Sequence, residues 1–196
     1  MPQVSKWFTV WIKIVSHPSE QTIVELSESP EAQTRIAYLW IFIAGVLFSA
    51  SSAIAYDASS NTRFPLITLL IVSMISGGIL TLSFIASILI KQWIAKRLGG
   101  TGTHPKLAYT FSAIYSPFAL VSSMFILLGT SSSMQVFAEA AIGLAFLYNL
   151  ILQIKSVKVI NQFGWKEAAI SVLIPFAGVL MFCSFVVQLA AVSNFS

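Results

Sequence analysis

The sequence predicts an all-α integral membrane protein, a five-helix bundle that follows a short amphipathic helix at the membrane interface. The first observation is composition: 57% of the residues are hydrophobic and 9% are charged, whereas a soluble domain carries about 25% charged residues. The second is a series of long uncharged runs separated by short polar connectors. The third is the crowding of Lys and Arg into alternate connectors. Together they argue against a soluble globular domain.

Residues 1–35 form a cytoplasmic segment that the sequence divides into two short helices. In the first helix, apolar side chains recur at helical spacing and form one stripe, made of Val4, Trp7, Phe8, Trp11, Ile12 and Val15. Lys6 and Lys13 flank this stripe. The helix is too short to span a bilayer, so we expect it to lie in the interface with its Trp rings at headgroup depth. Packing on the bundle is the alternative, and the two are compatible.

The second short helix is bounded by two prolines. His17-Pro18 ends the first helix, and Ser19 is a candidate N-cap for the next. This helix carries Glu20, Glu25 and Glu28 and ends at Ser29-Pro30. We expect its carboxylates to pair with nearby basic residues, although each exposed pair contributes little to stability.

Residues 36–196 form the transmembrane domain, whose spans are bounded by charged residues. We place five spans near residues 36–56, 64–90, 107–128, 136–154 and 168–192. Each is close to the roughly 20 apolar residues that a spanning helix needs. The third and fourth spans share a run of 48 residues without Lys or Arg. A single helix of that length would measure about 72 Å, so the run must fold back. Residues 129–133 provide the break, because Gly and Ser are poor helix formers.

The basic residues assign an orientation to these spans. The N-terminal segment and the second and fourth connectors hold ten of the eleven Lys and Arg, and only Arg63 lies on the other side. By the positive-inside rule the N-terminus is cytoplasmic and the C-terminus is outside, in the plasma or inner membrane if the chain is prokaryotic. Four or six spans would break this alternation. The net charge of +4 is therefore explained by the basic residues of the cytoplasmic loops. For this reason we do not interpret it as a sign of nucleic-acid binding, and we predict no nucleic-acid partner.

Small residues and prolines mark where the spans pack or bend. Small side chains at every fourth residue let helices approach closely in lipid; they are Gly45, Ser49 and Ala53, Ser73 and Gly77, Ser83 and Ser87, and Ala141, Ala145 and Asn149. Pro117 and Pro175 lie inside the third and fifth spans and should kink them. A functional hinge at these prolines is an alternative to a static bend.

No residue pattern indicates catalysis, so we predict a protein without enzymatic activity. We name no catalytic, cofactor-binding or metal-binding residue and expect no cofactor. The sequence contains no His-Glu-x-x-His, Cys-x-x-Cys or Gly-x-Ser-x-Gly. Residues 99–103 are Gly-Gly-Thr-Gly-Thr, but they follow a helix and lack the Lys-Ser/Thr ending of a phosphate loop. We interpret these glycines as a helix stop.

A few polar residues within the spans are weaker candidates. Glu139 is ionisable, and an ionisable residue in a span is a functional candidate by default. Its position about one turn from the end of the fourth span favours an interfacial carboxylate. Asn149, Gln153 and Gln188 are placed to form hydrogen bonds between helices, but three such residues are too few to line a transport path.

Two ordered sets of short motifs run along the chain. The first is Ile94-Ala95-Lys96-Arg97-Leu98-Gly99-Gly100-Thr101-Gly102, followed by Leu107 and Tyr115-Ser116-Pro117. The second is Leu147-Tyr148-Asn149, Ile154-Lys155, Trp165-Lys166-Glu167-Ala168-Ala169 and Ile174-Pro175. Trp11 and His17-Pro18 precede them. In order and spacing these motifs resemble the Yip family, multi-pass membrane proteins named for interacting with Rab-type GTPases, and its short prokaryotic members in particular.

The resemblance implies five helices, a cytoplasmic N-terminus and a non-enzymatic role as a scaffold, adaptor or membrane-organising protein. The segment before the first span is shorter than in eukaryotic members, so we do not carry over the binding of a Rab-type GTPase. The expected partners are the bilayer, with anionic lipids at the basic loops, and a protein partner or a second copy. The alternative is a small transporter or channel subunit, which predicts a water-accessible cavity near Pro117, Pro175 and Asn149.

Overall fold

The structure is a computed structural model that describes residues 3–60 and 65–178. These residues form helices and no strands, which confirms the all-α prediction. The helices are α1 (Gln3–Ser16), α2 (Glu20–Glu28), α3 (Thr34–Ser60), α4 (Leu66–Arg97), α5 (His104–Leu128) and α6 (Gln135–Asn161), followed by a helix over residues 165–178.

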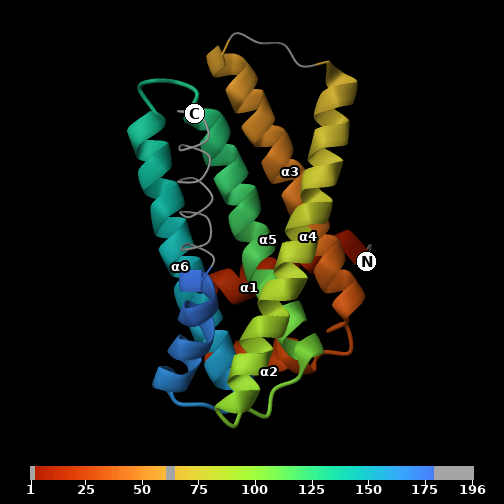
Figure 1. The fold of residues 1–196 in the computed structure, drawn as a ribbon, viewed down its shortest axis with the longest axis vertical. Helices are drawn as coiled ribbons and strands as arrows, with labels where there is room; N and C mark the ends of the chain where they lie inside the picture. Colours follow the sequence, from red (N-terminus) through yellow and green to blue (C-terminus); the bar gives the residue numbers. More distant parts are fainter. Residues whose placement is uncertain (1–2, 61–64, 179–196) are drawn as a thin grey trace, which may run out of the picture.

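The long helices α3 to α6 stand side by side with alternating direction. Helix α2 lies across them near one end, and α1 lies across them between that end and the far one (Figure 1). The connectors 98–103 and 162–164 lie at the end near α2, and the connector 129–134 lies at the other (Figure 1). We call this end the polar cap and define it as α2 with residues 91–106 and 155–167. The basic residues of two separate connectors thus share one end of the bundle with α2.

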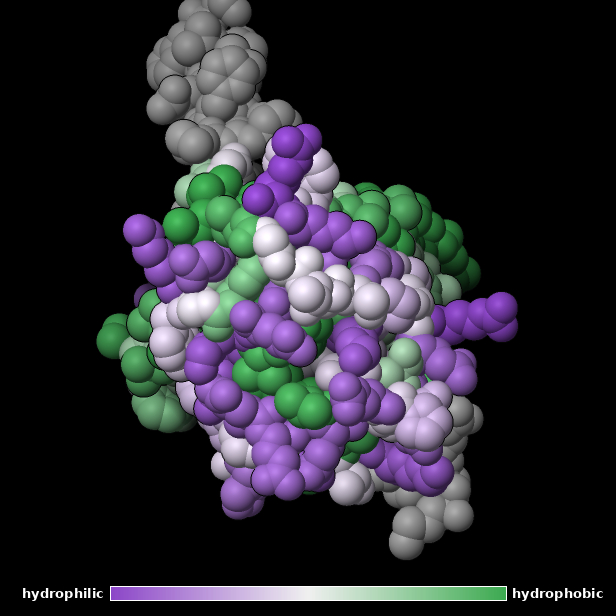
Figure 2. All heavy atoms as spheres, turned by 90° about the horizontal axis from the view of Figure 1, so that it is seen from below, coloured by the Kyte–Doolittle hydropathy of each residue, from purple (hydrophilic) through white to green (hydrophobic). Residues whose placement is uncertain are grey.

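Each of α3, α4, α5 and α6 is long and apolar enough to cross a membrane. They coincide with the first four predicted spans. Their outward surfaces expose large apolar side chains, among them Leu70, Ile75 and Leu144. In water such a surface would cause the protein to aggregate, whereas in a bilayer it would contact lipid chains. Viewed from the cap end, hydrophilic residues gather over the polar cap and apolar residues appear at its margin (Figure 2). The fifth predicted span begins within the helix over 165–178, and residues 179–192 lie outside the described residues.

Two helices extend beyond the ends that charge alone predicted. The second predicted span ends at residue 90, but α4 continues to Arg97. The fourth predicted span ends at residue 154, but α6 continues to Asn161. A charged residue marks where lipid contact stops, whereas a helix continues as long as its backbone hydrogen bonds do. The extra turns form much of the polar cap.

The glycines after α4 end the helix, as predicted. Gly99 has a φ of +91°, and its N–H donates to the carbonyl of Lys96 at 3.1 Å. The N–H of Gly100 donates to the carbonyl of Ala95 at 2.9 Å. This pair of bonds is a Schellman motif, which satisfies the last carbonyls of a helix.

The end of α6 has the same geometry without a glycine. Gln162 takes a φ of 57°, and the N–H of Phe163 donates to the carbonyl of Lys158 at 2.9 Å. A side chain in this left-handed region is strained. Two helix ends of one type therefore lie in the polar cap, one built on glycine and one on glutamine.

These two helix ends pack tightly against each other. The amide of Gly102 donates to Oδ1 of Asn161 at 3.1 Å, and Nε2 of Gln92 donates to the carbonyl of Gly102 at 2.5 Å. A Cβ on Gly102 would lie 2.6 Å from Oδ1 of Asn161, and one on Gly100 would lie 2.6 Å from Cζ of Phe163. The glycines between α4 and α5 therefore serve close packing as well as chain reversal.

The buried apolar clusters lie toward the polar cap. One joins Ile23 of α2 to side chains of α3, α4, α5, α6 and the helix over 165–178, and the other joins Trp11, Trp40 and Tyr109. Nearer the other end, α3 and α4 approach closely, since a Cβ on Gly45 would lie 3.2 Å from Cα of Gly77. The predicted small-residue contact is confirmed for this pair.

Candidate functional site

A pocket of about 510 Å³ lies within the bundle. It extends from the buried apolar clusters near the polar cap toward the opposite end of the bundle. It is lined by α3, α4, α5, α6 and the helix over 165–178, and we call it the bundle pocket. Its volume falls within the roughly 300–1,000 Å³ of small-molecule sites. Six of its lining residues matter here: Ser87, Lys91, Tyr115, Asn149, Gln153 and Pro175. Ser83 also lines it, so Ser83 and Ser87 face a space instead of the close helix contact that their spacing predicted.

Lys91 lies at the polar-cap end of the bundle pocket and is only 9% exposed. Its Nζ donates to Oε1 of Gln153 at 2.9 Å and lies 4.9 Å from the centre of the Phe111 ring. Nε2 of Gln153 then donates to Oδ1 of Asn149 at 2.5 Å. This chain of hydrogen bonds connects α4 to α6. The predicted hydrogen bond between helices is thus confirmed for Gln153, whose partner is Lys91 of α4. The bond of Asn149 is to Gln153 of the same helix.

The position of Lys91 corrects its assignment from the sequence. Charge counting treated it as one of the basic residues of a cytoplasmic loop, but it lies inside the bundle before α4 ends at Arg97. Every Asp and Glu of the chain lies in the described part, and no ion pair joins any of them to Lys91. A buried ammonium without a carboxylate is costly. One of its three donors contacts Gln153, so it is suited to an anionic ligand.

The lining of the bundle pocket changes from polar to apolar along its length. Lys91 and Gln153 lie toward the cap ends of α4 and α6, and Asn149 lies one turn further from the cap, at the middle of α6. Leu80 and Ile142 lie toward the opposite end of the same helices. A ligand that matches this lining has one charged end and one apolar end.

Within the described residues, no group of three or more His, Cys, Asp and Glu is placed to hold a metal ion. The polar groups that line the bundle pocket are an ammonium, amides and hydroxyls.

No known protein family, curated protein or solved structure matches this chain.

The two ordered sets of motifs are separate in sequence, but some of their residues meet in space. Tyr115, Asn149 and Pro175 come from three of these motifs and line the same pocket. The glycine motif at 99–102 packs on Asn161, close to the second set. These motif residues thus belong to two local structures, the bundle pocket and the polar cap.

Aromatic side chains fasten α1 to the bundle. The ring of Trp40 on α3 lies 5.6 Å from that of Trp11, 6.0 Å from that of Trp7 and 5.1 Å from that of Tyr109. The hydroxyl of Tyr148 donates to the carbonyl of Val15 at 2.8 Å. The predicted packing of this helix on the bundle is confirmed.

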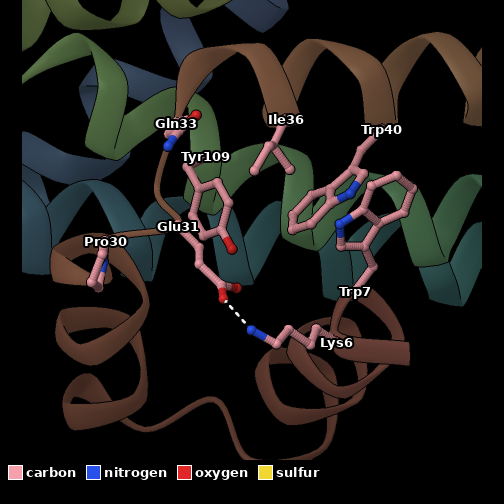
Figure 3. Close-up of a pocket in the computed structure, with 8 residues that line it drawn as sticks. All are labelled: Lys6, Trp7, Pro30, Glu31, Gln33, Ile36, Trp40 and Tyr109. Carbon is pink, nitrogen blue, oxygen red and sulfur yellow. Dashed lines mark hydrogen bonds and ion pairs between the residues drawn. The ribbon is translucent and has the colours of Figure 1, made fainter. Parts of the chain in front are cut away.

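A smaller pocket of about 360 Å³ lies where α1, the segment before α3, α3 and α5 meet. Figure 3 shows Lys6 reaching across its mouth to Glu31, while Trp7 and Trp40 lie together on one side. The Lys6–Glu31 pair measures 2.8 Å. Because both side chains are about half exposed, this pair holds the position of α1 more than it adds stability.

The acidic helix α2 pairs with basic residues from three other helices, as the sequence predicted. Glu25 pairs with Lys13 at 2.6 Å, Glu28 with Lys106 at 3.3 Å and Glu20 with Lys158 at 2.5 Å; these lysines belong to α1, α5 and α6. The N-terminus of α2 is capped by Ser19, whose Oγ accepts from the amide of Thr22. The predicted cap and both proline boundaries are confirmed.

These ion pairs affect both the carboxylates and the remaining basic charge. The hydrogen bond from Lys158 lowers the pKa of Glu20, and the hydrogen bond from Lys13 lowers the pKa of Glu25. Lys155 also donates to the carbonyl of Pro18. Four lysines are therefore engaged with carboxylates of the chain itself. The other exposed basic residues near this end are Arg35, Lys96, Arg97 and Lys166.

The remaining sequence candidates lie apart from the bundle pocket. Glu139 is exposed in the second turn of α6, where Oε1 accepts from Nε2 of Gln135 at 3.0 Å. Pro117 lies inside α5, which continues through it to Leu128. Gln188 lies outside the described residues. The burial of Lys91 was not predicted from the sequence. The pattern that could have indicated it is the helical spacing of Lys91 from Ser83 and Ser87, which places all three on one face of α4.

Proposed function

We propose that this chain is a non-enzymatic membrane-organising protein of Yip type, with five spans, a cytoplasmic N-terminus and an external C-terminus. In this proposal α1 lies in the cytoplasmic interface and acts on one leaflet. The partners are the bilayer itself, with anionic lipids near Arg35, Lys96, Arg97 and Lys166, and a protein partner or second copy that the chain holds in place.

The observation that carries the proposal is the division of α1 into three faces. Trp11 and Ile14 are buried against the bundle. Lys6 and Lys13 lie on one flank, paired with carboxylates on the α2 side. With about 3.6 residues per turn, residues 8 and 12 fall on the opposite flank, and Phe8 and Ile12 are 52% and 64% exposed. The basic flank thus faces the polar cap, and the apolar flank is free to enter lipid.

This arrangement supports a wedge that is fixed to the bundle. An interfacial helix whose apolar flank enters one leaflet expands that leaflet relative to the other and favours curvature. A free amphipathic helix would pay the ordering cost at each insertion, whereas α1 is already held by Trp40 and by the bond from Tyr148 to Val15.

Nitroxide accessibility in lipid vesicles tests the position of α1. The background variant is Cys183→Ser, labelled at Ile12→Cys on α1 or at Val24→Cys, an exposed site on α2. We expect the label at position 12 to meet lipid-soluble oxygen more often than an aqueous nickel chelate, and the label at position 24 to show the reverse. Greater accessibility of position 12 to the aqueous reagent would reject the wedge.

Vesicle shape tests the consequence. Reconstitution of the unmodified chain should yield smaller or tubular vesicles than protein-free lipid. The double variant Phe8→Ser and Ile12→Ser should restore the protein-free diameters, while the matched control Val24→Ser should not. Light scattering and electron microscopy measure both. Equal vesicle shapes for the double variant and the unmodified chain would reject the role of α1.

The alternative, a small transporter or channel subunit, is favoured by one observation. Its predicted cavity near Pro117, Pro175 and Asn149 has a counterpart in the bundle pocket, which Pro175 and Asn149 line and Pro117 does not. Planar-bilayer recordings separate the two functions. A membrane-organising protein leaves the conductance at the level of protein-free lipid, whereas discrete conductance steps that disappear in Asn149→Leu would favour the channel subunit.

A further inference from the structure

We propose that the bundle pocket binds one fatty acid, with the carboxylate at Lys91 and the acyl chain directed away from the polar cap. This inference requires only the bundle and is independent of the role proposed for α1. The observation behind it is a buried cation at one end of a pocket whose other lining residues are mostly apolar.

The charge at the polar end selects the headgroup. Lys91 is nearly buried, and its Nζ has one amide partner, Gln153, and the face of Phe111. A carboxylate there would accept a charge-assisted hydrogen bond from the ammonium, which is about twice as strong as a neutral one. Nε2 of Gln153 and the hydroxyl of Ser87 lie along the same lining and can serve the second carboxylate oxygen.

The size of the enclosure favours a carboxylate over a phospholipid headgroup. Lys91 is covered by Phe111 and Gln153 instead of facing open solvent. A bulky phosphodiester headgroup would require these side chains to move, whereas a carboxylate is planar and small. The exposed cations Lys96 and Arg97, further along α4, are better placed for headgroups at the membrane surface.

The length of the apolar part suits one acyl chain. From Lys91 to Leu80 the pocket follows α4 for about 16 Å, at about 1.5 Å per residue. The hydrocarbon core of a bilayer is about 30 Å thick, so one leaflet measures about 15 Å. The pocket therefore extends from the level of a leaflet's headgroups to about the bilayer midplane. Phe84, Phe146 and Ile142 line this part.

Native mass spectrometry of the full chain, released from a neutral detergent, tests the proposal with three probes. The probes are oleate, oleyl alcohol, which has the same chain without the charge, and phosphatidylglycerol, which is anionic with a larger headgroup. We expect one oleate per chain at concentrations that give at least ten-fold less binding of the other two. Equal binding of oleate and oleyl alcohol would overturn the proposal, and Lys91-dependent preference for phosphatidylglycerol would replace the fatty acid with a phospholipid.

Two variants locate the site. Lys91→Met keeps a long side chain but removes the charge and should lower oleate binding at least ten-fold. The control Lys106→Met, at a lysine of α5 whose side chain is 39% exposed and pairs with Glu28, should leave oleate binding unchanged. Ser87→Phe fills the pocket with an apolar ring and should also abolish binding while keeping the thermal unfolding midpoint, because it leaves Lys91 and its partners in place. Oleate should raise that midpoint in the unmodified chain. Unchanged oleate binding in both Lys91→Met and Ser87→Phe would place the ligand elsewhere and reject this site.

Discussion

At the scale of single residues, backbone conformation at two helix ends is the feature most open to test. Gly99 and Gln162 occupy the same left-handed position after α4 and α6. Glycine adopts that conformation without steric cost, and other side chains do not. The sequence revealed the first helix end through its glycines, but glutamine carries no such signal. The second end could be found only from the structure.

We predict that Gln162→Gly stabilises the protein by about 1 kcal/mol, because it removes the strain of a side chain at positive φ. Its counterpart, Gly99→Ala, should destabilise the protein by about 1–2 kcal/mol for the same reason. No atom lies within 4 Å of a Cβ built on Gly99, so the change isolates the backbone effect. Thermal unfolding in mild detergent measures both. A destabilised Gln162→Gly would show that the glutamine side chain makes a contact worth more than the strain.

The position of Lys91 close to a connector explains why the sequence analysis assigned it to a cytoplasmic loop. A lysine next to a connector is counted as a loop charge, because the sequence gives its position along the chain but not the direction of its side chain. Within α4, Ser83, Ser87 and Lys91 share a face, and whether this face meets lipid or protein depends on where α6 lies. The bond from Lys91 to Gln153, 62 positions further along the chain, is a product of packing.

At the scale of elements, α2 shows how a short helix is held by charge at its surface and by Ile23 and Leu26 in the core. The sequence predicted its bounds, its cap and its acidic character from local signals. It could not predict which cation each carboxylate meets, because the partners of Glu20 and Glu28 lie 138 and 78 positions away. These pairs connect α2 to α6 and α5.

We predict that the contribution of Glu20 and Glu25 to stability depends on pH. Their pKa values are lowered by the lysines, so the folded state favours the ionised form. The stabilisation is therefore present above the ordinary value of 4.5 and is lost as the pH falls through the lowered values. The double variant Glu20→Gln and Glu25→Gln should unfold at a lower temperature than the unmodified chain near neutral pH, and the difference should vanish in strong acid.

The matched control for this measurement is Glu139→Gln, an exposed carboxylate whose bond is to Gln135 and not to a cation. Its unfolding temperature should follow that of the unmodified chain at each pH. Because the pairs are exposed, the expected differences are small. A difference for the double variant that persists in strong acid would mean that the glutamates act by packing and not by charge.

At the scale of the whole molecule, the alternation of charge and hydropathy gives an architecture with two unlike ends. The basic connectors and α2 share the polar cap, while the connector at 129–134 lies at the far end (Figure 1). If the chain spans the membrane with the cap in the cytoplasm, the two ends must face different compartments. The prediction is that residues 129–135 are external.

Cysteine labelling in intact cells measures this topology. In a Cys183→Ser background, a membrane-impermeant maleimide should label Ser132→Cys from outside. The control position, Thr101→Cys in the polar cap, should be labelled only after the membrane is permeabilised. Both residues are exposed in connectors, so burial does not limit the reaction. Labelling of position 101 alone in intact cells would reverse the orientation and reject the positive-inside assignment.

The sequence by itself determined the helical class, the positions of the four long helices, the turn at 129–133 and the cap and proline boundaries of α2. These features depend on composition, on runs of apolar residues and on local capping, all of which act between near neighbours in the chain. Only the tertiary structure decided that Lys91 faces Gln153 inside a pocket, that Trp40 holds α1, and that Gly102 meets Asn161. Such contacts depend on which helix faces lie together, because packing joins residues that are far apart in sequence.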